Sequence, residues 1–179
     1  DIRRMDKAME EMCTLNMGGT AIGTGINADE AYLRRIVPNL AEVSNMEFVQ
    51  AFDLIDATQN LDPFVAVSGA IKACAVTLSK IANDLRLMSS GPKAGFNEIN
   101  LPVRQNGSSI MPGKINPTVA ELIMHLCDKV FSNVAGLNIG VHSGWLGSDS
   151  HSSLPLKCML DSFTLLSDGC EVFKRKVIS

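Results

Sequence analysis

The sequence predicts an all-α protein built on a bundle of long helices. Three stretches repeat apolar residues at steps of three and four, and no stretch alternates apolar and polar residues as a half-buried strand does. Steps of three and four place the side chains on one face of a helix, and long faces of this kind pack against other helices. We therefore expect residues 1–179 to form a single, partial helical-bundle domain.

The three periodic stretches predict three long helices. Their apolar faces cover residues 67–88, 119–141 and 156–177. These faces include Ile81, Leu122 and Cys170, which we expect to be buried. A proline, whose missing N–H is tolerated in the first turn of a helix, lies near each start: Pro63, Pro117 and Pro155.

Shorter helices and three loops complete the predicted order of elements. The shorter helices are expected over residues 2–13, 28–44 and 50–58. The loops are rich in small residues and cover residues 15–27, 89–116 and 142–153. The second loop is long for a compact domain, and loops of that length are usually functional or mobile.

The composition argues against several classes of function. Hydrophobic residues make up 46% of the chain and charged residues 20%, as in folded proteins. The net charge of -3 predicts no nucleic-acid surface, and no uninterrupted apolar run reaches the roughly 18 residues of a membrane span. The five cysteines include no CxxC pair, so neither a disulfide framework nor a zinc site is indicated. We expect a cytoplasmic protein.

Both ends of the sequence suggest a piece of a longer polypeptide. The first residue is Asp1 rather than methionine, and the last residues continue a helical pattern without a capping glycine. We therefore expect a complete functional site to need segments outside this chain.

The strongest chemical feature is the segment GSSIMPGKINP, residues 107–117. Gly107 and Gly113 permit backbone turns that a side chain would forbid. Lys114 and Asn116 lie at the predicted start of a helix, where a cation, an amide and free N–H groups together favour an anion. From the residues alone, a carboxylate site and a plain connecting loop remain equally open.

This segment resembles the signature loop of the aspartase/fumarase superfamily. The matching residues are Gly107, Ser108, Ser109, Met111, Pro112, Lys114, Asn116 and Pro117. The glycine-rich segment 15–25 and the segments 80–86 and 90–95 are also similar to those of fumarases and aspartases. The resemblance covers residues 12–141 in order and implies part of the central helical domain of that fold, without its N-terminal and C-terminal domains.

Flanking residues indicate a branch of the superfamily. The Met-Pro-Gly-Lys form of the loop favours the fumarase/aspartase branch over the argininosuccinate and adenylosuccinate lyases. Residues 97–102 and 15–18 are more similar to aspartases, and Asn106 stands where fumarases usually have proline. The resemblance therefore implies elimination of ammonia from L-aspartate to give fumarate. Interconversion of malate and fumarate, or a non-catalytic structural role on the same scaffold, remains the alternative.

The resemblance also assigns roles to individual residues. Ser108 takes the position of the general base that leads to an enediolate-like intermediate, and a serine acts so only when its alkoxide is stabilised. The positions expected to hold substrate carboxylates are Ser109, Lys114 and Asn116. The supporting loop positions are Gly107, Met111, Pro112, Thr20 and Gly23. We expect a small dicarboxylate or amino-acid substrate, no cofactor and no metal.

The family's active site is shared among subunits. The resemblance implies a homotetramer in which three subunits contribute to each site, with two further site segments before residue 1. One of these carries the catalytic-site histidine, so this chain alone is expected to be inactive. Residues 144–155 are longer and more polar than the family pattern, which leaves the substrate open to change.

Two other patterns favour ordinary structural interpretations. Residues 23–28 fit a loose dinucleotide fingerprint, but no strand precedes them. A metal or Ser-His-Asp site could be suggested by His142, Asp149 and His151. Their spacing is not diagnostic of either site, so a surface loop is the better interpretation.

Overall fold

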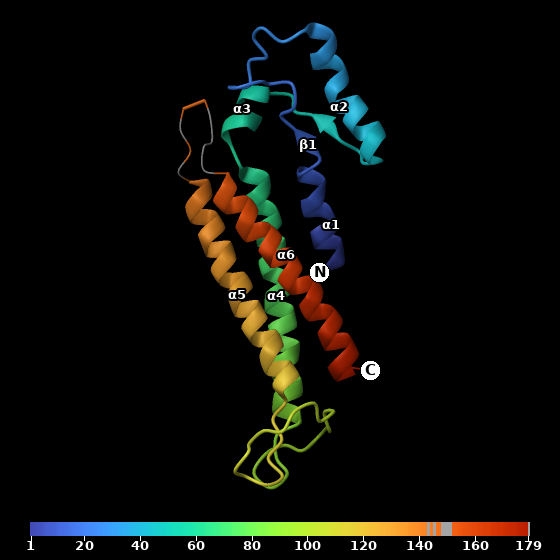
Figure 1. The fold of residues 1–179 in the computed structure, drawn as a ribbon, viewed down its shortest axis with the longest axis vertical. Coiled ribbons are helices and arrows are strands. Elements are labelled where there is room, and N and C mark those ends of the chain that lie inside the picture. The colour runs from blue at the N-terminus through green and yellow to red at the C-terminus, as the bar shows by residue number, and fades with distance from the viewer. Residues whose placement is uncertain (143, 145, 148–151, 179) are drawn as a thin grey trace. The chain divides into compact units, whose positions relative to one another are not determined.

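A computed structural model describes residues 1–142, 144, 146–147 and 152–178 (Figure 1). Its helices are α1 (Ile2–Glu11), α2 (Glu30–Ser44), α3 (Leu54–Gln59), α4 (Asp62–Met88), α5 (Thr118–Val141), α6 (Ser153–Phe173) and the π-helical turn η1 (Lys174–Ile178). The strands of the described residues are β1 (Thr14–Leu15) and β2 (Val49–Gln50), which pair in parallel. The predicted all-α class is confirmed, because the sheet is limited to these short strands.

Contacts between residues divide the chain into two compact units. The first unit contains Asp1–Ala70 and Val134–Met159, and the second contains Ile71–Asn133 and Leu160–Ser179. Each of the long helices α4, α5 and α6 therefore contributes residues to both units.

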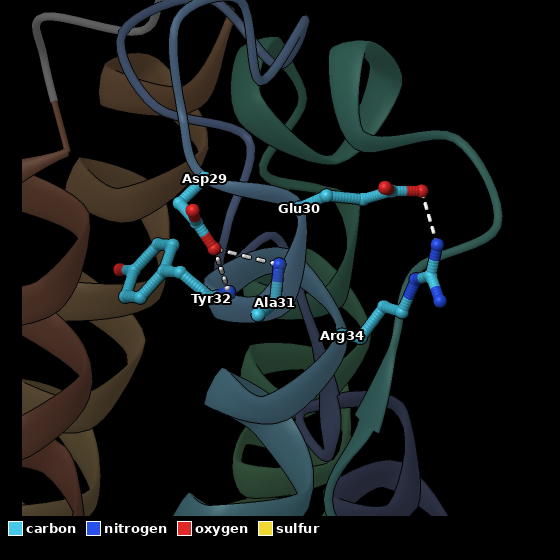
Figure 2. Close-up of polar contacts among 5 residues, drawn as sticks. All are labelled: Asp29, Glu30, Ala31, Tyr32 and Arg34. Carbon is cyan, nitrogen blue, oxygen red and sulfur yellow. Dashed lines mark hydrogen bonds and ion pairs between the residues drawn. The ribbon is translucent and has the colours of Figure 1, made fainter.

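The first unit carries the short elements, whose ends are fixed by local hydrogen bonds. Asp29 caps α2 because its carboxylate accepts the N–H groups of Ala31 at 2.8 Å and Tyr32 at 3.2 Å (Figure 2). Figure 2 also shows Glu30 paired with Arg34 one helical turn further on, which adds a small contribution on the exposed face. These contacts explain why α2 begins at residue 30 rather than at the predicted residue 28.

The second unit has a core of apolar residues from all three long helices. These include Ile71, Ala75, Ala82, Ala120, Ile123, Cys127, Val130, Leu166 and Phe173. The Asn133 side-chain amide donates to Ser162 Oγ at 3.2 Å, so two buried polar side chains satisfy each other between α5 and α6.

The long helices lie where the periodicity predicts them, but parts of their buried faces are rotated. Leu122 is 46% exposed and Ile81 is 42% exposed, and Cys170 is exposed as well. In α5 the neighbouring residue Ile123 is buried instead of Leu122. In α6 the buried position beside Cys170 is Gly169, where a Cβ would lie 3.3 Å from the Leu126 side chain. The expectation that Ile81, Leu122 and Cys170 are buried is therefore wrong within this chain.

Helix α4 is long and apolar enough to cross a membrane by length and composition, alone among the helices of the described residues. The core helix of a folded protein meets the same criterion. One face of α4 is buried at steps of four and seven, at Val67, Ile71, Ala75 and Ala82. The apolar run is interrupted by two cations, Lys72 and Lys80. We therefore interpret α4 as a bundle helix that packs along one face, with 28% of its most apolar window buried within this chain.

Candidate active-site loop

The residues with predicted chemical roles lie on the connection between α4 and α5. Its first part folds back on the end of α4, since Asn97 N donates to the Ser90 carbonyl at 2.7 Å and Phe96 N to Ser90 Oγ at 3.2 Å. Its second part is closed by an antiparallel bridge between Asn106 and Ile115. The eight residues between these two positions therefore form a loop whose ends are held together.

Gly107 sits at the neck of this loop and must be a glycine. Its N–H donates to the Lys114 carbonyl at 2.9 Å. A Cβ on Gly107 would lie 2.7 Å from that carbonyl oxygen and 3.1 Å from Asn116 Oδ1. The close approach of these backbones holds Gly107, the residue before Ser108, against Lys114 and Asn116.

The loop borders an open hollow of about 390 Å³. The hollow is lined by Val103, Asn106, Ser108, Ser109, Ile110, Met111, Pro112, Gly113, Lys114 and Ile115. The structure thus brings together the predicted base, Ser108, and two of the predicted carboxylate-binding residues, Ser109 and Lys114. The third, Asn116, lies at the neck beside Gly107.

Ser108 Oγ is surrounded by hydrogen-bond donors. It accepts the backbone N–H groups of Ile110 and Met111, each at 3.1 Å. Two N–H groups aimed at one oxygen stabilise negative charge on it, as an oxyanion hole does. Both N–H groups thus point at the oxygen that the resemblance predicts to be the base. Sequence reasoning did not find these donors, although a serine before a turn commonly accepts such bonds.

The supporting residues Thr20 and Gly23 belong to the first unit, whereas the loop belongs to the second. Gly23 has a φ of 81°, and a Cβ there would lie 2.3 Å from Ile55 Cα and from the Leu54 carbonyl oxygen. Thr20 has a φ of 60°, which is strained for a β-branched residue, and its hydroxyl donates to the Gly19 carbonyl at 2.6 Å. The glycine-rich segment is thus fixed closely against α3.

The alternative chemical sites receive no support. Asp149 and His151 lie outside the described residues, and among the residues that are described no three His, Cys, Asp or Glu side chains are grouped to hold a metal. Burial, aided by the charge of Asp128, raises the pKa of the Cys127 thiol to about 11. Cys127 is therefore a protonated core residue rather than a nucleophile at neutral pH.

Comparison with known proteins identifies the family. The sequence pattern that defines the family described as "Lyase" matches residues 1–132. The chain belongs to this lyase family. The predicted resemblance to the aspartase/fumarase superfamily is confirmed.

Several relatives are similar over the whole chain. The aspartate ammonia-lyase of Bacillus subtilis (strain 168) is 43% identical over 97% of the chain and 36% of its own length. Those of Pseudomonas aeruginosa and Escherichia coli (strain K12) are 44% and 41% identical over 100% of the chain, and over 38% and 37% of their own lengths. The chain therefore spans somewhat more than a third of the length of these relatives.

Solved structures show the same fold. A fumarate lyase:delta crystallin from Brucella melitensis bound to cobalt has a TM-score of 0.95 and 38% identity, covering 99% of this chain and 38% of that chain. A class II fumarase from Schistosoma mansoni has a TM-score of 0.89 and 28% identity, covering 99% of this chain and 40% of that chain. The helical architecture of this chain is thus that of the lyase family.

Proposed function

We propose that the protein to which these residues belong is an aspartate ammonia-lyase, and that residues 1–179 form part of its central helical domain. One observation carries the proposal: the closed loop 107–114 places Ser108, with two N–H groups on its Oγ, in the same hollow as Lys114. The identity of 41% to 44% to the aspartate ammonia-lyases of three bacteria supports the choice of substrate.

In this mechanism Ser108 is the general base. Its alkoxide removes a proton from the aspartate carbon next to the side-chain carboxylate, and that carboxylate becomes an enediolate-like dianion. The electron pair then forms the carbon–carbon double bond, the bond to nitrogen breaks and ammonia leaves, which gives fumarate. The Ile110 and Met111 N–H groups stabilise the alkoxide before the proton is taken.

Lys114, Asn116 and Ser109 bind the substrate carboxylates in this proposal. Lys114 provides a cation at the edge of the hollow. A fixed cation stabilises the dianion more strongly than the monoanionic ground state of the same carboxylate, so it accelerates the step as well as binding the substrate. The substrate is accordingly a small amino acid with two carboxylates.

The assembly proposed for the intact protein is a cytoplasmic homotetramer. The long helices carry exposed large apolar residues that their own chain does not cover: Val76, Ile81, Leu87, Leu122, Ile139 and Leu160. Large apolar side chains that stay exposed on all three long helices are candidates for burial in an interface. These positions support burial against further copies or further segments of the intact protein.

The test is to supply the full-length protein with L-aspartate and L-malate separately and to follow fumarate by its ultraviolet absorbance. Fumarate from aspartate alone supports the proposal. Fumarate from malate alone would identify a fumarate hydratase, the second candidate, which the likeness to the Schistosoma mansoni fumarase favours. Fumarate from neither would contradict both and favour a structural protein on the same scaffold.

A further inference from the structure

A contact beside the catalytic loop is not explained by the proposed mechanism. Arg104 Nε donates a hydrogen bond to the carbonyl oxygen of Lys176 at 3.0 Å, across 72 residues of sequence. Arg104 lies in the segment that leads into the loop, three residues before Gly107. Lys176 lies in η1, the π-helical turn after α6. The hydrogen bond therefore joins the entry of the loop to a different helix of the same unit.

Both ends of the loop meet η1 at this place. A void of about 10 Å³ is lined by the entry residues Leu101, Pro102 and Arg104, by the first residues of α5, and by Lys176 and Val177. A space of that size holds at most about one water molecule, so it marks a packing contact rather than a ligand pocket. The entry, the exit and the π-helical turn are thus packed together under the loop.

The two ends of the loop are held differently. The exit, with Lys114 and Asn116, continues at once into α5, a regular helix. The entry, with Ser108, has no helix directly before it, and its contacts include the bridge at Asn106, the hydrogen bond from Gly107 N to the Lys114 carbonyl and the hydrogen bond from Arg104. Loss of the Arg104 contact would therefore move the proposed base more than the carboxylate-binding residues.

We propose that Arg104 is a positioning residue that fixes the entry of the catalytic loop against η1 and thereby orients Ser108. The proposal rests on the proposed function, because it explains how the base of that reaction is held. It requires that removal of the guanidinium slow the chemical step while substrate binding stays close to normal.

The test uses Arg104→Met and Arg104→Lys in the full-length enzyme, with Arg175→Met as the matched control. Arg175 lies in the same π-helical turn but pairs with Glu171 at 3.3 Å, so its loss changes the charge of η1 without touching the loop. For Arg104→Met we expect kcat to fall about five- to tenfold, as loss of one solvent-exposed hydrogen bond would produce, with KM changed less than about twofold. Arg104→Lys keeps a cationic donor and should recover most of kcat.

Hydrogen exchange of residues 105–116 provides a readout independent of turnover. Arg104→Met should exchange faster in this segment while Arg175→Met matches the wild type. Equal kcat and equal exchange in Arg104→Met and Arg175→Met would overturn the proposal. It would also be overturned if Arg104→Met lost thermal stability and kcat together and Arg104→Lys did not restore kcat. If the wild-type enzyme forms no fumarate, the proposed function fails, whereas the exchange comparison still decides whether Arg104 holds the loop.

Discussion

At the residue scale, the neck of the loop depends on the missing side chain of Gly107. The backbone of Gly107 approaches Lys114 so closely that a Cβ would lie 2.7 Å from its carbonyl oxygen. Real Cβ atoms do not approach a backbone oxygen so closely, so the neck must open to admit one. Opening the neck would separate Ser108 from Lys114, the two residues that the proposed reaction needs together.

We therefore expect Gly107→Ala to lower kcat/KM about a hundredfold, since a displacement of about 1 Å of catalytic groups can cost that much. Gly113→Ala is the control in the same loop. Gly113 has a φ of 74° but open space around its Cα, so an alanine there meets backbone strain of roughly 1–2 kcal/mol and no clash. Steady-state kinetics of the two full-length variants would measure the difference, and equal losses would show that the neck is not closed as described.

Cys127 provides a prediction for the core of the second unit. Its pKa is raised to about 11 in the folded protein, so the folded state favours the protonated thiol. The protonated Cys127 thiol stabilises the folded state fully at pH values below the thiol pKa of the unfolded chain, about 8.5. This stabilisation is lost as the pH rises through the thiol pKa of the folded protein. The free energy of unfolding should therefore fall more steeply with pH above about 9 in the wild type than in Cys127→Ala. Parallel pH profiles from denaturant titrations would contradict the burial of this thiol.

Site residues could be predicted from the sequence only where a side chain carries the signal. Ser108, Ser109, Lys114 and Asn116 are visible as a motif, and the structure places the first three around one hollow. The N–H groups that reach Ser108 Oγ are backbone atoms, and the sequence indicates them only through the habit of a serine before a turn to accept such bonds. Their effect depends on the course of the chain after the serine.

At the scale of the elements, periodicity located the long helices and most of the faces they bury, but it failed at some positions on each helix. Apolar residues occupy more than one side of α5, so Leu122 and Ile123 compete for the interior, and packing buries Ile123. The strands β1 and β2 have two residues each, too few for an alternating pattern to show. The turn η1 differs from an α-helix in its hydrogen bonds rather than in its apolar spacing, so the sequence predicted only a continued helix.

Two glycines of the first unit allow a test of the helix packing. Gly69 lies in α4 with no atom within 4 Å of its added Cβ, so Gly69→Ala should raise stability by about 0.5–1 kcal/mol through helix propensity. Gly140 lies in α5, where a Cβ would come 2.8 Å from Pro155 Cδ. We expect Gly140→Ala to lower stability by about 1–3 kcal/mol, the usual cost of overpacking. Thermal unfolding of both variants checks the pair, and stabilisation by Gly140→Ala would contradict the contact with α6.

At the scale of the whole molecule, the chain carries one part of the proposed active site. It spans 36% to 38% of the length of the bacterial aspartate ammonia-lyases compared here. The proposed base and the proposed carboxylate-binding residues lie on one loop of the second unit, whereas Thr20 and Gly23 lie on a loop of the first. We therefore expect full activity only in the full-length, assembled protein.

The most direct test of the proposed mechanism is Ser108→Ala in that protein, with fumarate formation and aspartate binding measured side by side. If Ser108 is the base, kcat falls by about 10²- to 10⁴-fold, the range of general acid–base catalysis, while the affinity for aspartate stays close to that of the wild type. Ser109→Ala, by contrast, should weaken binding. A Ser108→Ala enzyme with a near-normal kcat would contradict the assignment of Ser108 as the base.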